Sequence, residues 1–157
     1  MLHNMLASKV ASIRKDKDAE DRGFTLIELL VVVVIIGILI AIAIPLYLNY
    51  QKGAKDKSAQ SDLRAAVSSL QQCYTDNSSF YPASLSLSGS VYTPSATGCA
   101  NDVINVSSGT TLTYTPLPAS CTDATCTSFT ITSYNSGGNR GSGNPYTYTS
   151  TAGGQIN

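Results

Sequence analysis

Charged side chains are scarce in this sequence of 157 residues, where they make up 13% of the chain, about half the usual fraction. Its basic and acidic side chains are equal in number, at ten each. The chain therefore has no surplus of Lys and Arg with which to bind phosphate groups. We expect no nucleic-acid partner for the isolated chain.

Histidine is almost absent as well, because the single copy is His3 near the N-terminus. Removal of that end would exclude histidine-based catalytic triads and histidine-ligated metals. Charge is also rare from Ser78 to Asn157, which holds only Asp102, Asp123 and Arg140, whereas 29 of its 80 residues are Ser or Thr. We expect a protein that is no enzyme and has no cofactor and no metal site.

One long apolar run stands out against this polar background. Leu29–Leu48 contains twenty residues without a charge, which as a helix would span about 30 Å, the hydrocarbon thickness of a bilayer. Tyr47 and Tyr50 end the run, and three lysines follow, as in the interfacial belt of a membrane helix. A buried core helix is the alternative, but so small a domain could hardly cover it on all sides. The run is expected to cross a membrane.

The cysteines indicate which side of the membrane the rest of the chain occupies. Five Lys or Arg residues precede the run and four follow it within residues 52–64, so the positive-inside rule chooses neither side. The four cysteines, Cys73, Cys99, Cys121 and Cys126, all follow the run. An even number in a small region is typical of disulfides and of an oxidising compartment, although a zinc site is an alternative. We place the N-terminus in the cytoplasm and the C-terminus outside.

Helical periodicity continues beyond the apolar run. Apolar side chains recur on one helical face, at Ala59, Leu63, Ala66, Val67, Leu70 and Tyr74. The opposite, wet face is predicted to consist of Lys55, Asp56, Asp62, Arg64, Ser68, Gln71 and Gln72. One long helix is therefore expected, whose second half, residues 52–75, has an apolar stripe that needs a partner.

The partner of this stripe is predicted to be a small antiparallel β-sheet within residues 102–157. Short segments rich in Thr, Tyr, Val and Ile indicate strands at Val103–Val106, Thr111–Thr115, Ser128–Tyr134 and Tyr146–Thr149. Asn135–Pro145 is rich in Gly and Asn, as a hairpin tip would be, and residues 76–101 are expected to form a loop. The fold class is therefore α+β.

A short motif precedes the apolar run, where a signal peptide would instead have its cleavage site after the run. The motif is Gly23-Phe24-Thr25-Leu26-Ile27-Glu28. It resembles the signature of the type IV prepilins, in which these residues introduce an unbroken apolar stretch. The resemblance covers Gly23 to about Gln51, and beyond that it is architectural.

The resemblance implies that residues 1–23 are a leader. A membrane-embedded prepilin peptidase would cut between Gly23 and Phe24, and Phe24 would then be N-methylated. Residues 24–51 would form the hydrophobic helix that spans the membrane and later polymerises. Residues 52–157 would form a head outside the cytoplasm, similar in architecture to the heads of type IV pilins.

Glu28 can be interpreted from physics alone, because a carboxylate at the edge of an apolar run is expensive and its default interpretation is functional. Cleavage after Gly23 creates an α-ammonium at Phe24, one helical turn away, and places Glu28 in the first turn, where the helix dipole favours an anion. In the resembled family, the Phe24 amine of a neighbouring subunit is thought to match this charge. Snorkelling to the membrane surface is the alternative.

Gly37 and Pro45 bracket Ile38–Ile44, which we expect to be the weakest part of the helix. Proline lacks an N–H, so the carbonyl of Ala41 loses its helical hydrogen bond, and glycine adds backbone freedom. A simple kink is one interpretation. The family resemblance implies another, in which this segment stretches when subunits pack into a filament.

Four cysteines allow three disulfide pairings, of which we choose Cys73–Cys99 with Cys121–Cys126. If the two central strands form a hairpin, Cys121 and Cys126 lie on its opposite arms at a separation suitable for a disulfide. Cys99 would then close the intervening loop against the helix at Cys73. The alternative is that Cys121 and Cys126 reach back separately to Cys73 and Cys99.

The resemblance implies a structural subunit that polymerises through its N-terminal helix into an extracellular filament for adhesion, motility or DNA uptake. Its partners would be further copies of itself, the peptidase, an assembly ATPase and a platform protein. A minor pilin or a type II secretion pseudopilin is the first alternative. A membrane-tethered enzyme or binding module is the second, and the charge-poor head argues against catalysis.

Overall fold

The computed structural model describes residues 23–151 and 154–157 of the chain. The predicted leader, apart from Gly23, lies outside the described residues. The chain divides into two compact units, with the boundary between Pro45 and Leu46.

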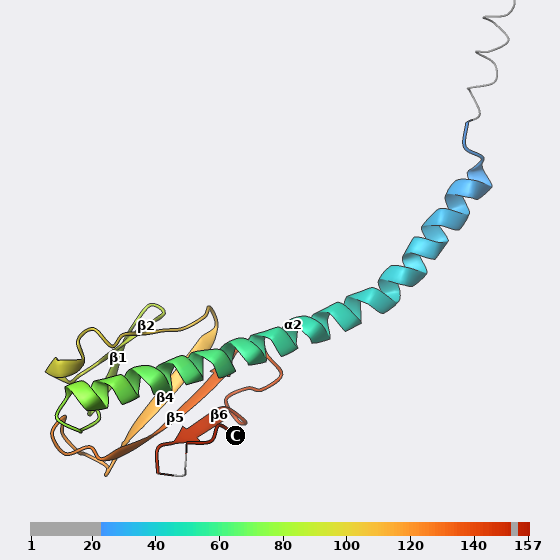
Figure 1. Ribbon diagram of the computed structural model, residues 1–157. Coiled ribbons are helices and arrows are strands. Elements are labelled where there is room, and N and C mark those ends of the chain that lie inside the picture. Colours follow the sequence, from blue (N-terminus) through green and yellow to red (C-terminus); the bar gives the residue numbers. More distant parts are fainter. Residues whose placement is uncertain (1–22, 152–153) are drawn as a thin grey trace, which may run out of the picture. The chain divides into compact units, whose positions relative to one another are not determined.

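The main element of the first unit is the beginning of helix α2, which runs from Leu26 to Asp76 over 51 residues (Figure 1). Its apolar side chains up to Ile44 are all exposed, from 48% at Val31 to 82% at Leu26. By length and composition this helix could cross a membrane. Gly37 and Pro45 both lie inside it, as expected. A β-carbon at Gly37 would meet nothing within 4 Å, so internal packing does not require glycine there.

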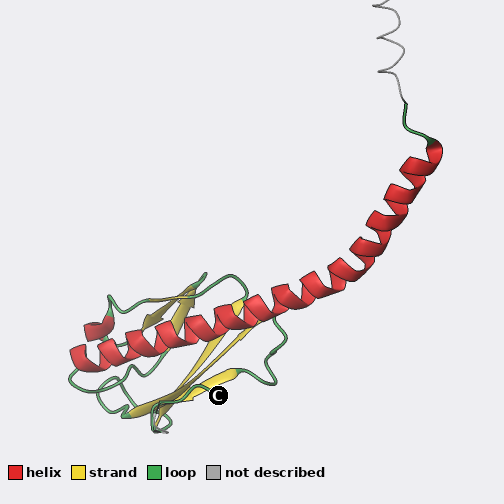
Figure 2. Cartoon of the chain, turned by 45° about the vertical axis from the view of Figure 1, so that its right-hand side comes forward, coloured by secondary structure: helices red, strands yellow, loops and turns green. Residues whose placement is uncertain are grey.

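The second half of α2 packs against β-structure within the second unit. Figure 2 shows this part of the helix lying across the strands. Its buried apolar residues are Ala59, Leu63, Ala66, Val67, Leu70 and Cys73, and Tyr74 is half-buried. The predicted apolar face is thus the one that packs, and the α+β fold with a long N-terminal helix on small antiparallel sheets is confirmed.

The structure has two three-stranded antiparallel sheets, whereas the sequence predicted one sheet. The first joins β1 (Leu85–Ser88), β2 (Val91–Pro94) and β3 (Ile104–Asn105). The second joins β4 (Thr110–Leu117), β5 (Ser128–Asn135) and β6 (Tyr146–Thr149), with β5 in the centre. A short 3₁₀-helix, Thr97–Cys99, lies between β2 and β3.

The strands β1 and β2 fall within residues 76–101, for which the sequence analysis expected a loop. Their sequences explain the difference, because β1 reads Leu-Ser-Leu-Ser and is exposed along most of its length. A segment so rich in serine has weak intrinsic strand preference. Its pairing with β2, in which Leu85 faces Pro94, depends on tertiary context.

The core of the second unit lies between α2 and the inner face of β5. Alternate residues of β5 are buried, namely Phe129, Ile131, Ser133 and Asn135. The Ser133 hydroxyl donates to the Ala59 carbonyl on α2 at 2.9 Å, which satisfies a polar group inside the core. Tyr81, Tyr114 and Tyr148 surround Phe129, with ring centroids 4.7–5.7 Å away. This cluster joins the sheet to the loop after the helix.

Candidate functional site

The N-terminal end of α2 is organised by reciprocal hydrogen bonds between Thr25 and Glu28. The Thr25 backbone N–H and hydroxyl donate to Oε2 of Glu28 at 2.8 and 2.7 Å. In return, the Glu28 N–H donates to the Thr25 hydroxyl oxygen at 3.3 Å. This pattern is a capping box, which satisfies amide groups that have no partner within the helix. The helix accordingly begins at Leu26.

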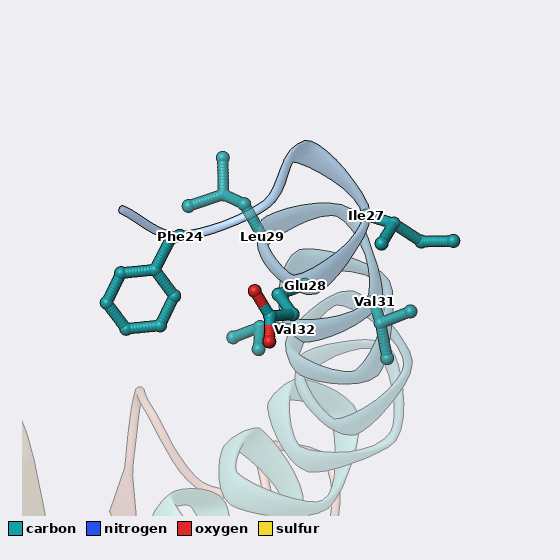
Figure 3. A pocket seen from close by; sticks show the side chains of 6 residues that line it. All are labelled: Phe24, Ile27, Glu28, Leu29, Val31 and Val32. Atoms are coloured by element: carbon teal, nitrogen blue, oxygen red, sulfur yellow. The ribbon is translucent and has the colours of Figure 1, made fainter. Parts of the chain in front are cut away.

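The surface around this helix end is apolar apart from one carboxylate. Figure 3 shows its side chains around an open hollow. The hollow has a volume of about 570 Å³. The lining residues are Phe24, Ile27, Glu28, Leu29, Val31 and Val32. Phe24 is 90% exposed, and no aliphatic neighbour is buried. A surface of this kind suits lipid or other apolar helices, and Glu28 is the one charged residue among the described residues that line it.

Thr25 is the residue of this site that the sequence analysis missed. The signal was present, because a Thr followed three residues later by a Glu, just ahead of an apolar run, is the sequence pattern of a capping box. The pattern gives Glu28 a local structural role in addition to the assembly role predicted for it. Both Thr25 bonds go to Oε2, and among the described residues none donates to Oε1.

Gly23 and the four cysteines complete the set of predicted site residues. A β-carbon on Gly23 would meet nothing within 4 Å, so packing within the chain does not require glycine there. In the structure Cys73 is bonded to Cys99 and Cys121 to Cys126. These are the two pairs chosen from the sequence, and peptide mapping of the protein is their test.

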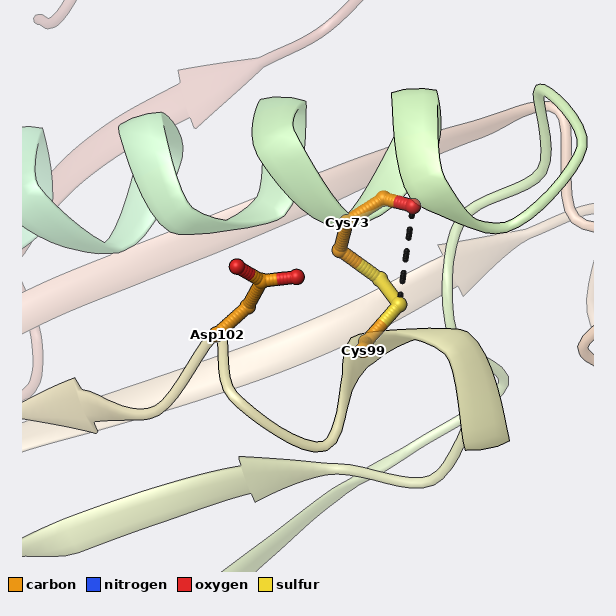
Figure 4. A group of neighbouring side chains, drawn as sticks. All are labelled: Cys73, Cys99 and Asp102. Carbon is orange, nitrogen blue, oxygen red and sulfur yellow. Dashed lines mark hydrogen bonds between the residues drawn. A yellow bond between two sulfur atoms is a disulfide. The ribbon is translucent and has the colours of Figure 1, made fainter.

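The Cys73–Cys99 disulfide lies beside Asp102 (Figure 4), a combination of side chains that could in principle bind a metal. The two sulfur atoms are bonded to each other, which removes the thiolates that a zinc ion needs. Sγ of Cys99 also lies 3.5 Å from the Cys73 carbonyl oxygen. Because a disulfide sulfur carries no hydrogen, this is a packing contact.

Two carboxylates predicted to lie on the wet face of the helix are buried instead, so that prediction is wrong for Asp56 and Asp62. Asp56 is 8% exposed and accepts hydrogen bonds from the backbone N–H groups of Asn139 and Arg140, both at 3.0 Å. Asp62 is 9% exposed and accepts from the N–H and hydroxyl of Ser107 at 2.9 and 3.1 Å. Each carboxylate therefore ties α2 to a loop of the sheets.

A third carboxylate, Asp123, ties the Cys121–Cys126 loop to its surroundings. It accepts from the Ala83 N–H and the Ser95 hydroxyl, both at 2.6 Å. The Asn77 side chain, just after α2, donates to the Asp123 carbonyl at 2.6 Å. The small disulfide loop is therefore fixed against the end of the helix.

Comparisons with known proteins concern only part of the chain. Residues 19–44 match the family model of the prokaryotic N-terminal methylation motif. The chain is 45% identical over 56 residues to the type IV major pilin protein PilA of Myxococcus xanthus, a match covering 36% of this chain and 26% of that protein. It is 46% identical over 55 residues to the type IV major fimbrial protein FimA of Dichelobacter nodosus, covering 35% of each.

A relative from a different system is also similar. The match to the type II secretion system core protein G of Pseudomonas aeruginosa is 41% identical over 58 residues, covering 37% of this chain and 41% of that protein. The chain thus spans less than half the length of each of these relatives. No solved structure matches it.

The methylation motif falls on a defined part of the fold. The motif covers the capped start of α2 and most of its apolar run, and the second half of the same helix packs on small antiparallel sheets. The N-terminal part of the chain therefore carries the prokaryotic N-terminal methylation motif and is similar to type IV pilins.

Proposed function

We propose that this protein is a structural subunit of a type IV pilus, which polymerises through its N-terminal helix into an extracellular filament. The observation that carries the proposal is the apolar first half of α2, whose side chains from Leu26 to Ile44 are exposed, with a single carboxylate, Glu28, in its first turn. Such a helix needs lipid or other helices around it, and both are apolar environments between which packing decides. The filament serves adhesion, motility or DNA uptake.

Processing precedes assembly in this proposal. Prepilin peptidase cuts between Gly23 and Phe24, and Phe24 is then N-methylated. The space around Gly23 supports this role, because the chain itself would accommodate a larger side chain there. The requirement for glycine then comes from the enzyme that recognises the site.

Glu28 keeps one oxygen for assembly in this proposal. The capping box with Thr25 engages Oε2, which leaves Oε1 to receive the Phe24 amine of an incoming subunit. A charged pair in apolar surroundings is favourable only when both partners are present, because an isolated buried charge is expensive. The pair therefore favours entry of a correctly placed subunit over entry of an uncleaved one.

Before assembly, the protein crosses the cytoplasmic membrane once with its N-terminus inside. The two disulfides of the second unit support an oxidising location for the head. An assembly ATPase and a platform protein then move subunits from the membrane into the filament. The role is structural, without catalysis or a cofactor.

A second candidate is a minor pilin or a pseudopilin of a type II secretion system. The similarity to type II secretion system core protein G favours it, because the share of that relative covered is larger than for the two pilins. In this candidate the same N-terminal helix assembles a short structure that serves secretion.

Sheared surface filaments from the native host, analysed by mass spectrometry, distinguish the two candidates. If the proposal is right, this chain is the dominant protein of the sheared fraction, and its deletion removes the filaments. Filaments that persist without the chain, together with a loss of protein secretion, would replace the proposal with the pseudopilin role.

A further inference from the structure

We infer that the head of this protein has a basic end and an acidic end, and that the basic end of one copy binds the acidic end of another copy of the same chain. This inference rests on the proposed function and names the contact between heads within the filament. It depends on where the few charges of the second unit are found.

The basic end surrounds the start of the second unit. Lys52, Lys55 and Lys57 are exposed on α2, and Arg140 stands in the loop before β6. The loop lies against the helix here, because Asp56 accepts the N–H groups of Asn139 and Arg140. Asp56 is the one carboxylate at this end, and its burial in these bonds removes it from the surface. Three exposed lysines and the half-buried Arg140, whose guanidinium lies over the Tyr146 ring, therefore place positive charge at this end.

The acidic end surrounds the last turn of α2. Asp76 is exposed there, and no basic residue occupies that turn. Asp102 lies close by, and its pKa is raised by burial and then by the negative charge of Asp76. Asp123 belongs to the same end through its bond with Asn77. The helix dipole adds further negative potential at this position.

The remaining two charged residues, Asp62 and Arg64, have opposite signs and lie near the middle of this helical segment, so they add no net charge. The second unit therefore has equal numbers of basic and acidic side chains, but a surplus of three positive charges at one end and three negative charges at the other. Lys52 and Asp76 are separated by about 36 Å along the helix, several times the Debye length of about 8 Å in physiological salt. The two ends do not neutralise each other within one chain.

The basic end also has a hollow in which a neighbour can dock. An open groove of about 510 Å³ is lined by Tyr47, Tyr50, Lys52, Lys55 and Gly137, among others. Two tyrosine rings beside two ammonium groups suit a surface that carries carboxylates and little other charge. The acidic end of another copy has this composition.

The proposed function determines how two copies can meet. Copies that polymerise through the same helix have the same polarity in the filament, so an antiparallel arrangement of heads is excluded. Two parallel heads at the same height bring like charges together, whereas a shift along the helix axis brings the acidic end of one beside the basic end of the next. Such a contact is heterologous and repeats into an open helical array. The charges therefore oppose unshifted pairs and favour the stagger of a filament.

Charge reversal with rescue tests the inference in the full chain, expressed in its own host in place of the wild type. Lys52→Glu/Lys57→Glu makes the basic end negative, and Asp76→Lys/Asp102→Lys makes the acidic end positive. Each double variant opposes like charges across the contact, and we expect sheared filament yield to fall by about tenfold or more, because like-charge contacts cost several kcal/mol. The fourfold variant restores opposite signs, and we expect its yield to return to within about threefold of wild type.

Two controls separate docking from folding. Ser68→Glu/Thr113→Glu places two negative charges at exposed positions between the ends, and should leave the yield unchanged. Asp76→Lys places a cation at the helix C-terminus, which should stabilise the head, so lost filaments could not be attributed to unfolding. Membrane levels of every variant are measured in parallel.

The outcomes distinguish this inference from the proposed function. If wild type forms filaments and both double variants give the same filament yield as wild type, the inference is wrong but the proposed function stands. Loss in both double variants without recovery in the fourfold variant would overturn it too, since complementarity predicts rescue. Absence of this chain from wild-type filaments would overturn the proposed function and the inference together.

Discussion

Gly138 lies so close to the Asp56 carboxylate that a β-carbon at this position would collide with Oδ1. The collision would displace the carboxylate from the backbone N–H groups of Asn139 and Arg140. Each of these groups donates a hydrogen bond to it, with a nitrogen-to-oxygen distance of 3.0 Å. One missing side chain therefore permits the bond between the helix and the loop before β6. This contact links residues more than eighty positions apart in the sequence.

The Gly138→Ala variant should lose about 1–3 kcal/mol of unfolding free energy, because it leaves a buried carboxylate without its hydrogen bonds. Urea denaturation of the mature chain in detergent measures the loss. Gly143→Ala is the matched control, since a β-carbon there meets nothing within 4 Å. Equal stability of the two variants would show that the loop can move away from Asp56 without penalty.

Mature protein should begin at Phe24, which mass spectrometry and N-terminal sequencing can establish. The expected mass reflects loss of residues 1–23 and the gain of one methyl group. Gly23→Val should leave the leader attached, whereas Gly37→Ala, also unobstructed in the chain, should be processed normally. A mature N-terminus after Leu48 would restore an ordinary signal peptide.

The Glu28→Gln variant should remain folded and membrane-inserted but form far fewer filaments. A glutamine oxygen can still accept the Thr25 N–H bond of the capping box, so helix capping is largely kept while the charge is lost. Thr25→Val is the complementary variant, since it removes the hydroxyl and keeps the carboxylate. Sheared filament yield is the measurement, and normal filaments from Glu28→Gln would reduce Glu28 to a helix cap.

The two disulfides should differ in their contribution to stability. In the chain-closure model, a loop with the Cys73–Cys99 separation of 26 contributes roughly 3–4 kcal/mol, and the Cys121–Cys126 loop roughly 2 kcal/mol. Cys73→Ser should therefore lower the unfolding midpoint more than Cys121→Ser. Non-reducing peptide mapping checks the pairs, and a Cys73 fragment linked to Cys121 or Cys126 would refute them.

Tyr114 should make the head sensitive to alkaline pH. Burial, followed by the electrostatic effects of Tyr81 and Asp123, raises its pKa above the ordinary value of 10.0. The folded state thus favours the neutral phenol, so this contribution is complete below pH 10.0 and declines as pH rises above it. Tyr114→Phe removes the hydrogen bond that the Tyr114 hydroxyl donates to the Pro82 carbonyl. Near neutral pH this should lower the unfolding free energy by about 1 kcal/mol.

The same variant should lose less stability than wild type between pH 7 and about pH 11, because it has no phenol to ionise at that position. Denaturation curves at both pH values give the comparison. Identical declines in the two proteins would assign the alkaline sensitivity to other groups.

The sequence by itself determined the features that depend on local pattern. The exposed apolar helix follows from twenty residues without a charge, and the packed face of its second half follows from the spacing of Ala59, Leu63, Ala66, Val67 and Leu70. Strands β4, β5 and β6 follow from their β-branched and aromatic residues. These features could be predicted because each is a pattern that repeats along one helix or one strand.

Only the tertiary structure decided the roles of Asp56 and Asp62. By helical position Asp56 shares the packed face, because Ala59 and Leu63 follow it by three and seven residues. Burial of a carboxylate there is unfavourable unless partners compensate for its lost hydration. Those partners are amide groups of Ser107, Asn139 and Arg140, contributed by loops far along the chain. The strands β1 and β2 were decided in the same way, since a serine-rich segment becomes a strand only when another strand lies beside it. Periodicity records which residues share a face, whereas the groups that meet that face are determined by the fold.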